Sequence, residues 1–255
     1  MNILTLHTTS KTIYLNLKHS LSLTLQYFYP LAGHLVWPQN LSEPEFCYVD
    51  GDSVSLTLAE SDGDFYHLSG NHARDVNQFH FLVPKLTLPS MVDLDFSISL
   101  LALQVTVFPN SGICIGVTAS HVALDARTLV HFMKSWATIS RSGVVSLSPD
   151  SGLPGSSSSR NIFWKLHDRA EYFISSRSAA KEPFAVAGSP KYRIYDTDFG
   201  WGRPKKYESL RVGGKFVSLY DCKDGEGSLE VGVAFPKLQL DSFSSLFYRF
   251  QANVA

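Results

Sequence analysis

A histidine and an aspartate four residues apart carry the chemistry that this sequence could perform. His121 follows an apolar run, and Asp125 stands at the start of an amphipathic pattern. A neutral imidazole in such a place can take a proton from a hydroxyl or an amine at neutral pH. Taken singly, each residue favours a plainer interpretation: Asp125 as a helix N-cap, and His121 as a buried histidine with a hydrogen-bond partner.

Two strands and a helix would position these side chains. Residues 100–108 and 113–120 both read as strands, and the turn-forming tetrapeptide between them is typical of a β-hairpin. A helix is predicted from about Ala126, because apolar residues recur there at helical spacing. These are Leu129, Phe132, Met133 and Trp136. We therefore expect His121 at the end of the second strand and Asp125 at the start of the helix.

The whole chain is predicted to divide into two parts, residues 1–150 and residues 151–255. Apolar spacing predicts a helix over 18–35, and alternation predicts a strand over 53–58. Residues 142–159 are rich in serine, glycine and proline, which is typical of a linker.

Beyond that linker the predicted elements are short. They are a helix over 164–177, a strand over 192–195, a hairpin of residues 216–219 and 229–235, and a closing helix over 240–250.

Composition excludes several classes of protein. The 22 basic and 23 acidic residues leave a net charge of -1, which gives no reason to expect nucleic acid or an anionic membrane as partner. No apolar run is long enough for a membrane span, and the first residues do not resemble a signal peptide, so we expect a cytoplasmic protein. Neither the three separate cysteines nor the acidic run over 43–64 has metal-ligand spacing, so no metal site is predicted.

A second motif occurs downstream of the histidine. Its residues are Asp198, Phe199, Gly200, Trp201 and Gly202. In this order the two motifs, HXXXD and DFGWG, resemble the plant BAHD acyltransferases, which transfer an acyl group from a coenzyme A thioester to an alcohol or amine. Residues 29–35, 135–136 and 186–190 are similar to further motifs of the family. Residues 34–38, 52–54, 59–62 and 202–206 resemble the branch that acylates anthocyanins and phenolic glucosides, often with malonyl groups.

The resemblance implies a fold and a set of roles. The fold would be α/β and chloramphenicol acetyltransferase-like, with two lobes of mixed sheet and helices and a channel between them. His121 would be the general base, Asp125 would orient its loop, and the segment 198–202 would be structural, with Trp201 packed in a tight turn. Acyl-CoA, with malonyl-CoA among the candidates, would be a co-substrate rather than a bound cofactor, the acceptor would be a small molecule, and the enzyme would be a monomer.

This chain also departs from the family pattern. Family members are nearly twice as long, and the sequence reads as starting after their first strand and passing near Asp150 directly to a late part of the second lobe. The residues that contact coenzyme A would lie largely in the missing part and cannot be assigned. Ala126 stands where the family has glycine, and Ser120 where the malonylating branch often has histidine. A catalytically inactive homologue is therefore the alternative to an active acyltransferase.

Overall fold

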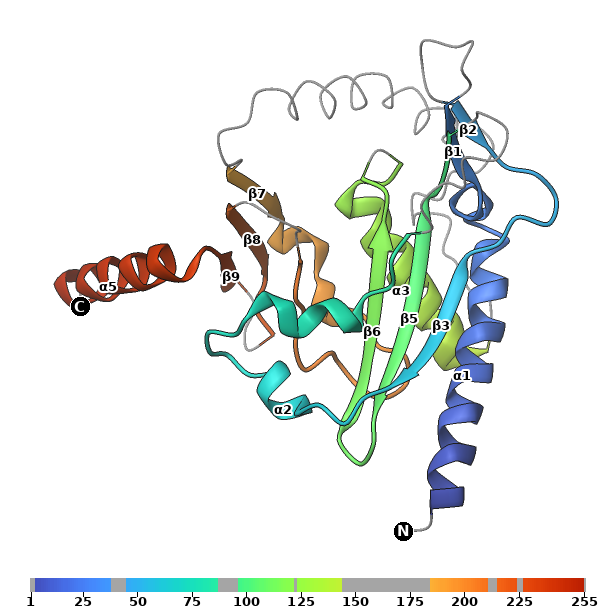
Figure 1. Ribbon diagram of the computed structural model, residues 1–255, viewed down its shortest axis with the longest axis horizontal. Coiled ribbons are helices and arrows are strands. Elements are labelled where there is room, and N and C mark those ends of the chain that lie inside the picture. Colours follow the sequence, from blue (N-terminus) through green and yellow to red (C-terminus); the bar gives the residue numbers. More distant parts are fainter. Residues whose placement is uncertain are drawn as a thin grey trace.

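The computed structural model describes residues 3–37, 45–86, 96–121, 123–143, 184–210, 215–223 and 227–254. Within these ranges the strands form three three-stranded sheets, here called A, B and C. Long helices flank sheet B, and another long helix follows sheet C (Figure 1). The α/β class with mixed sheets that was predicted from the sequence is confirmed.

Sheet B positions the histidine. It contains β3 (Ser55–Glu60), β5 (Leu101–Phe108) and β6 (Gly112–Ala119), in the order β3-β5-β6. The central strand β5 pairs in parallel with β3 and in antiparallel with β6. The predicted hairpin is thus confirmed, and β5 reads as a nearly continuous apolar run because it is buried along its whole length.

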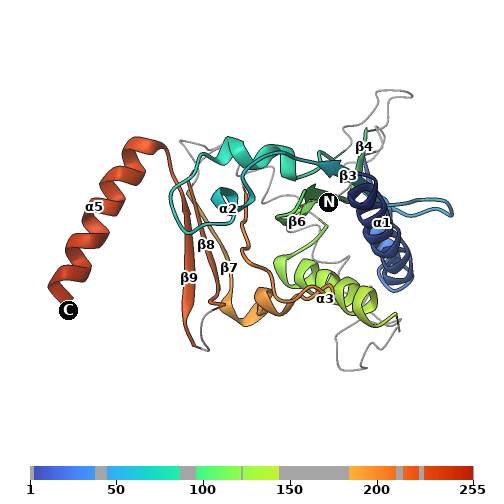
Figure 2. The ribbon, with the colours of Figure 1, turned by 90° about the horizontal axis from the view of Figure 1, so that it is seen from below.

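Helices α1 (Ile3–Leu25) and α3 (Ala126–Ser142) lie side by side against one face of sheet B (Figures 1 and 2). Trp136 of α3 is fully buried there, and its indole N–H donates to Leu17 O and Ser20 Oγ of α1, each at 3.1 Å. A buried indole needs a partner for its N–H. This bond fixes the register of the two helices while the large ring fills the core between them.

The opposite face of sheet B is covered by the 3-10 helix η2 (Val76–Leu82) and the residues after it. Gln104 of β5 donates to Phe81 O at 2.7 Å, although it is almost buried. Gly116 of β6 has no room for a side chain, because an added Cβ would lie 1.9 Å from Leu82 O. The segment therefore runs directly over the backbone of β6, on the strand that leads to His121.

The other two sheets differ in how well the sequence predicted them. Sheet A contains β1 (His34–Trp37), β2 (Glu45–Cys47) and β4 (Phe96–Ser99), and none of these strands was predicted. Sheet C contains β7 (Phe184–Gly188), β8 (Lys215–Asp221) and β9 (Leu229–Ala234). Its β8–β9 hairpin confirms the prediction, and α5 (Lys237–Val254) is the predicted last helix. The short helix α2 (Phe65–Leu68) lies between β3 and η2.

Two predictions were wrong. The helix predicted over 18–35 begins at Ile3 and ends at Leu25, and the 3-10 helix η1 (Tyr29–Ala32) follows it. Pro30 has no amide hydrogen and disfavours a helical residue before it, so the α-helix cannot continue. Residues 192–195 do not form a strand: they lie in the 3-10 helices η3 (Pro190–Tyr192) and η4 (Ile194–Asp196) and the turn between them.

The predicted linker over 142–159 lies outside the described residues except for Ser142 and Gly143, and the helix predicted over 164–177 lies wholly outside them. Gly143 ends α3 in the left-handed conformation (φ 64°), and its amide donates to Ile139 O at 2.9 Å. Glycine adopts this conformation without strain, which explains why the helix ends here.

Candidate active site

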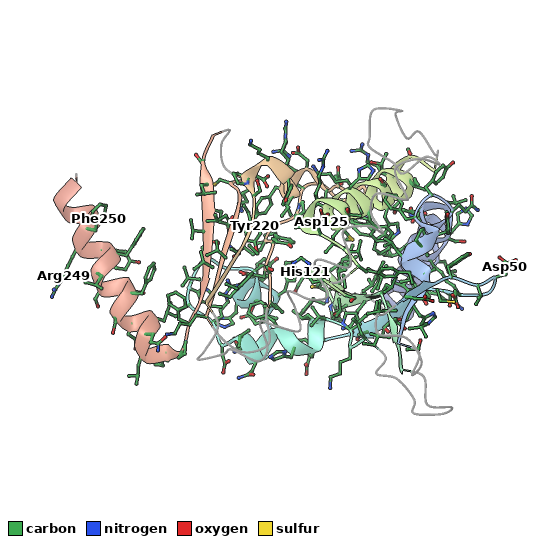
Figure 3. All side chains as sticks on the ribbon, turned by 90° about the horizontal axis from the view of Figure 1, so that it is seen from above. Asp50, His121, Asp125, Tyr220, Arg249 and Phe250 are labelled. Carbon is green, nitrogen blue, oxygen red and sulfur yellow. The ribbon has the colours of Figure 1, made fainter. Side chains whose placement is uncertain are left out.

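The loop after β6 places His121 at the surface beside α3. The sheet pairing extends one step past β6, since Ser120 N donates to Leu100 O at 2.8 Å. The chain then turns: the amides of Ala123 and Leu124 both donate to Ser120 O, at 2.9 and 3.1 Å. Leu124 is buried in the core and anchors this turn, whereas His121 is exposed. Figure 3 shows His121 and Asp125 in the middle of the molecule, between sheet C and α1.

A backbone carbonyl determines which ring nitrogen of His121 can accept a proton. Nδ1 of His121 lies 2.9 Å from Leu124 O. A carbonyl oxygen can only accept, so a neutral imidazole carries its hydrogen on Nδ1 and leaves the lone pair on Nε2. The turn thus holds the ring in the tautomer that a general base requires.

Asp125 caps the helix that follows. Its Oδ1 accepts from Thr128 N at 2.8 Å, and its own backbone is extended (φ -84°, ψ 167°), as is usual for an N-cap. The cap interpretation of Asp125 from the sequence is therefore confirmed. Ala126 is the first helical residue of α3 and has no left-handed backbone, so replacing the family's glycine there causes no strain of that kind.

The segment 198–202 forms a tight turn around the Asp198 carboxylate. Asp198 Oδ1 accepts from the amides of Gly200 and Gly202, at 2.8 and 2.9 Å, and Oδ2 lies 3.3 Å from Nη1 of Arg141. Hydrogen bonds to the Asp198 carboxylate hold its pKa below the ordinary value. The Gly200 amide contributes most, and the Gly202 amide and Arg141 contribute less. Both glycines have positive φ, at 103° and 94°, a backbone that other residues rarely adopt.

Phe199, not Trp201, is the buried ring of this turn. Phe199 is 8% exposed and packs edge-to-face on Trp136 of α3, with ring centroids 4.9 Å apart. Trp201 is half exposed and stacks on the outer side of Phe199. The expectation of a packed Trp201 is therefore wrong, because the turn points the first aromatic ring inward and leaves the second on the surface.

The two motifs lie at opposite ends of the same helix. Asp125 caps the N-terminus of α3, whereas Arg141 of its last turn pairs with Asp198. Seventeen residues at 1.5 Å each separate these ends by about 25 Å. Within the described structure the segment 198–202 thus supports α3 from a distance and lies away from His121.

Three further polar side chains were missed by the sequence interpretation. His131 of α3 packs beside Phe28, with ring centroids 5.5 Å apart. Burial is the main cause that lowers its pKa, and the positive charges of Arg127 and Lys134 lower it further. Lys134 donates to Tyr192 O at 2.8 Å, and burial lowers its pKa too. Tyr220 is buried on sheet C, and burial raises its pKa. The strand predicted over 216–219 ends one residue before Tyr220, and no pattern indicated the other two.

The described residues contain neither a metal-type cluster nor a membrane-spanning helix. No group of three or more His, Cys, Asp or Glu side chains in these ranges could hold a metal ion. Among the helices described, none is both long and apolar enough to cross a bilayer.

The structure is that of an α/β protein with mixed sheets, a capped helix and an exposed histidine at the end of a strand. Comparison with sequence families identifies it further: the model of the Transferase family matches residues 4–151 and 155–250. The chain belongs to this family, the BAHD acyltransferases that its two motifs resemble. The resemblance inferred from the sequence is therefore confirmed.

Individual relatives carry related names. The phenolic glucoside malonyltransferase 1 of Nicotiana tabacum is 47% identical over 134 residues, which are 52% of this chain and 30% of that protein. The malonyl-CoA:anthocyanidin 5-O-glucoside-6''-O-malonyltransferase of Arabidopsis thaliana is 47% identical over 131 residues, or 51% of this chain and 28% of the relative. The aligned parts thus span under a third of these two proteins.

A longer alignment shows that this chain lacks a stretch that a relative contains. The anthocyanin 3-O-glucoside-6''-O-malonyltransferase of Dahlia pinnata is 27% identical over 394 residues, covering 93% of this chain and 85% of the relative. Because that alignment is longer than the 255-residue chain, a stretch of the relative has no counterpart here. Among solved structures, vinorine synthase is similar in fold, with a TM-score of 0.56 at 15% identity, covering 85% of this chain and 80% of that one.

Proposed function

We propose that this chain is an acyl-CoA-dependent O-acyltransferase that acylates a hydroxyl of a phenolic or flavonoid glycoside, with His121 as general base. The observation that carries the proposal is the hydrogen bond between His121 Nδ1 and Leu124 O. It directs the basic nitrogen, Nε2, away from the protein backbone while the side chain remains exposed to a substrate. A histidine held in this way offers the Nε2 lone pair to a hydroxyl that comes within hydrogen-bond reach.

The proposed reaction takes place with acceptor and acyl-CoA bound together. The acceptor hydroxyl gives its proton to Nε2 as its oxygen attacks the thioester carbonyl, and a tetrahedral intermediate forms. When this intermediate collapses, the C–S bond breaks, the ester remains, and the coenzyme A thiolate takes the proton back from the imidazolium. No enzyme nucleophile and no resident cofactor take part in this sequence.

The names of the relatives support the substrate class. They include malonyltransferases and coumaroyltransferases that act on anthocyanins, anthocyanidin glucosides or phenolic glucosides. For this chain we propose a malonyl or aromatic acyl-CoA as donor and a small glycoside as acceptor. We also propose that it acts in the cytoplasm, a reducing compartment with which its free cysteines Cys47, Cys114 and Cys222 agree.

We propose that the two motifs belong to two different lobes. Residues 1–150 would form the lobe that carries His121, and residues 151–255 would contribute the linker and the remaining part of a second lobe. In support, His121 Nδ1 lies beside Leu124 O and Asp125 Oδ1 accepts from Thr128 N, and all four residues belong to the first part.

The direct test compares two histidine variants. Purified wild-type protein given malonyl-CoA and a phenolic glucoside should release an acylated product, and His121→Ala should lower the rate by about 10²- to 10⁴-fold, the usual contribution of a general base. His19→Ala is the control, because His19 is equally exposed but lies on α1. Equal rates for both variants and the wild type would exclude His121 as the base.

The second candidate is a catalytically inactive homologue. The gap in the alignment with the Dahlia relative favours it, since a channel formed by two lobes would lose part of its wall. Calorimetric titration of the folded chain with malonyl-CoA separates the two candidates. Absence of binding by a folded sample would support the inactive homologue, whereas binding with turnover supports the enzyme.

A further inference from the structure

Two histidine rings meet on the segment that leads from β3 to η2. Nε2 of His72 lies 3.0 Å from Nδ1 of His67, with ring centroids 4.6 Å apart. His67 belongs to the last turn of α2, and the ring of His72 lies against Gly70, where an added Cβ would be 2.7 Å from it. The turn between the two residues thus brings the rings together. Both residues are exposed, so protons from solvent can reach them.

The hydrogen-bond pattern gives each ring a role. Oε1 of Gln78 lies 3.4 Å from Nε2 of His67 and can only accept, so this nitrogen carries a hydrogen. In a neutral His67 ring the other nitrogen, Nδ1, is then bare and accepts from Nε2–H of His72. His72 can take up a proton on its own Nδ1 and still donate. A proton on His67 Nδ1 removes the acceptor, because two N–H groups would then face each other across 3.0 Å.

The loop that joins the two rings also contacts the later part of the chain. Asn71 Oδ1 accepts from Nζ of Lys206 at 2.9 Å, and Arg74 pairs with Glu208. Nε of Arg74 donates to His72 O at 3.1 Å, which ties the guanidinium to the backbone of the second histidine. These links between residues 64–82 and residues 203–208 therefore depend on the shape of the loop.

Further positive charge is unfavourable at this loop. The charged and titratable groups of the segments that meet here are Asp64, Arg74, Asp75 and His80, then Lys205, Lys206 and Glu208, and Glu230 of β9. Each carboxylate among them already has a partner: both glutamates form ion pairs with these cations, and both aspartates accept from backbone amides. Nζ of Lys205 lies 4.1 Å from the ring centroid of Tyr66, the residue before His67. Charges on both histidine rings would thus repel each other and the cations nearby.

We propose that His67 and His72 form a proton-operated clasp between residues 64–82 and residues 203–208. While His67 Nδ1 is bare, the N–H···N bond holds the loop closed. When both rings are charged, they separate, and Asn71 and Arg74 lose their partners. Because the open loop binds one proton more than the closed loop, the closed form is lost as the pH falls.

The clasp acts next to the strand that leads to His121. Its segment continues to Leu82, whose carbonyl lies so close to Gly116 of β6 that an added Cβ would be 1.9 Å away. Opening of the clasp would therefore loosen the cover of β6 on the face opposite α1 and α3. The inference rests on the hydrogen bonds of the loop and does not depend on acyl transfer.

Hydrogen exchange read by mass spectrometry tests the clasp in the intact chain. Between about pH 7.5 and about pH 5, where histidine changes its charge, exchange in residues 66–74 and 203–208 should accelerate relative to β5. Once corrected for the intrinsic effect of pH, the acceleration should be about tenfold or more, since one pH unit changes a one-proton equilibrium tenfold. β5 is the reference because it is buried along its whole length. Unchanged relative exchange in both segments would overturn the proposal.

Two variants keep a hydrogen bond in the pair but cannot place charges on both rings. His67→Asn offers Oδ1 as the acceptor in place of Nδ1, and His72→Gln offers an amide that can donate or accept. Each should remove the acceleration. His80→Asn is the matched control, because His80 is an exposed histidine of the neighbouring η2, and it should respond to acid as the wild type does.

The outcome that contradicts the clasp is equally plain. An acceleration that persists in His67→Asn and His72→Gln, or one that His80→Asn removes as well, would show that acid loosens this region without the pair. Circular dichroism at the higher pH checks that each variant is folded before exchange is compared.

Discussion

Asp125 acts on its surroundings through a backbone amide. Its Oδ1 accepts from Thr128 N at 2.8 Å, and the same turn presents the carbonyl of Leu124 to the ring of His121. The negative charge of Asp125 also lies near the positive end of the α3 helix dipole, which is a stabilising arrangement. At this scale, the position of the His121 ring depends on whether the helix begins at Ala126.

Substituting Asp125 separates its cap from its charge. Asp125→Ala should lower the free energy of unfolding by about 1 kcal/mol, because an alanine cannot accept from Thr128 N. Asp125→Asn should lose less than Asp125→Ala, since asparagine caps helices about as well as aspartate and only the charge is removed. Urea titrations of both variants measure these differences. If Asp125→Asn were as unstable as Asp125→Ala, the negative charge rather than the cap would be the important property.

Helix α3 combines the site at one end with a support at the other. Its N-terminus orients the loop of His121, its middle buries Trp136 against α1, and its last turn pairs with Asp198. One of the polar residues on its inner side is His131, whose Nε2 atom is buried and has no hydrogen-bond partner within the described residues. A neutral ring tolerates this position beside Phe28 far better than a charged one.

The stability of the fold should therefore depend on pH through His131. Burial, Arg127 and Lys134 lower its pKa, so below the ordinary value of about 6.5 the unfolded chain binds a proton that the folded chain does not. The free energy of unfolding should then decrease as the pH falls from 7.5 to 5.5. His131→Phe should reduce this decrease, whereas His19→Phe on the exposed side of α1 should leave it unchanged. Urea midpoints at both pH values give the answer, and equal slopes for His131→Phe and the wild type would contradict it.

Elements dominated by local contacts were predictable from the sequence, and elements that depend on distant partners were not. The β5–β6 hairpin and α3 show strong local periodicity and clear turn or cap residues, so both were found together with His121 and Asp125. In contrast, Ile194 and Tyr195 favour strands, but their amides donate to the Asp221 carboxylate, at 2.7 and 3.4 Å. That tertiary contact overrides the local preference.

The same distinction applies to sheet A and to the aromatic motif. The strands of sheet A are short and pair residues up to 65 positions apart, as His34 with Ser99, so no local pattern indicated them. In the motif 198–202 the residue types identified the tight turn, but they did not show which aromatic ring is buried. That choice depends on Trp136, which lies about sixty residues earlier in the chain.

Over the whole molecule, residues 184–210 are attached to the first 143 residues by contacts of different kinds. Phe199 packs on Trp136, Lys206 donates to Asn71 Oδ1 at 2.9 Å, and Arg74 pairs with Glu208. The side chain of Arg74 is only 10% exposed and that of Glu208 28%, so solvent screens this pair less than it screens a surface pair. Arg74 also donates to the carbonyls of Leu68 and His72, which fixes its guanidinium toward Glu208.

Neutralising Glu208 should destabilise the assembled chain much more than neutralising a surface carboxylate. Glu208→Gln leaves the nearly buried Arg74 without its counter-charge, and we expect a loss of roughly 1–3 kcal/mol in the free energy of unfolding, below the full cost for a buried pair because Glu208 is partly exposed. Asp241→Asn breaks the Lys237 pair on α5, whose side chains are 87% and 60% exposed, and should change stability by less than about 0.5 kcal/mol. Urea unfolding of both variants at low protein concentration compares them directly. A Glu208→Gln protein as stable as Asp241→Asn would mean that apolar contacts such as that of Phe199 with Trp136 hold the two parts together without the ion pair.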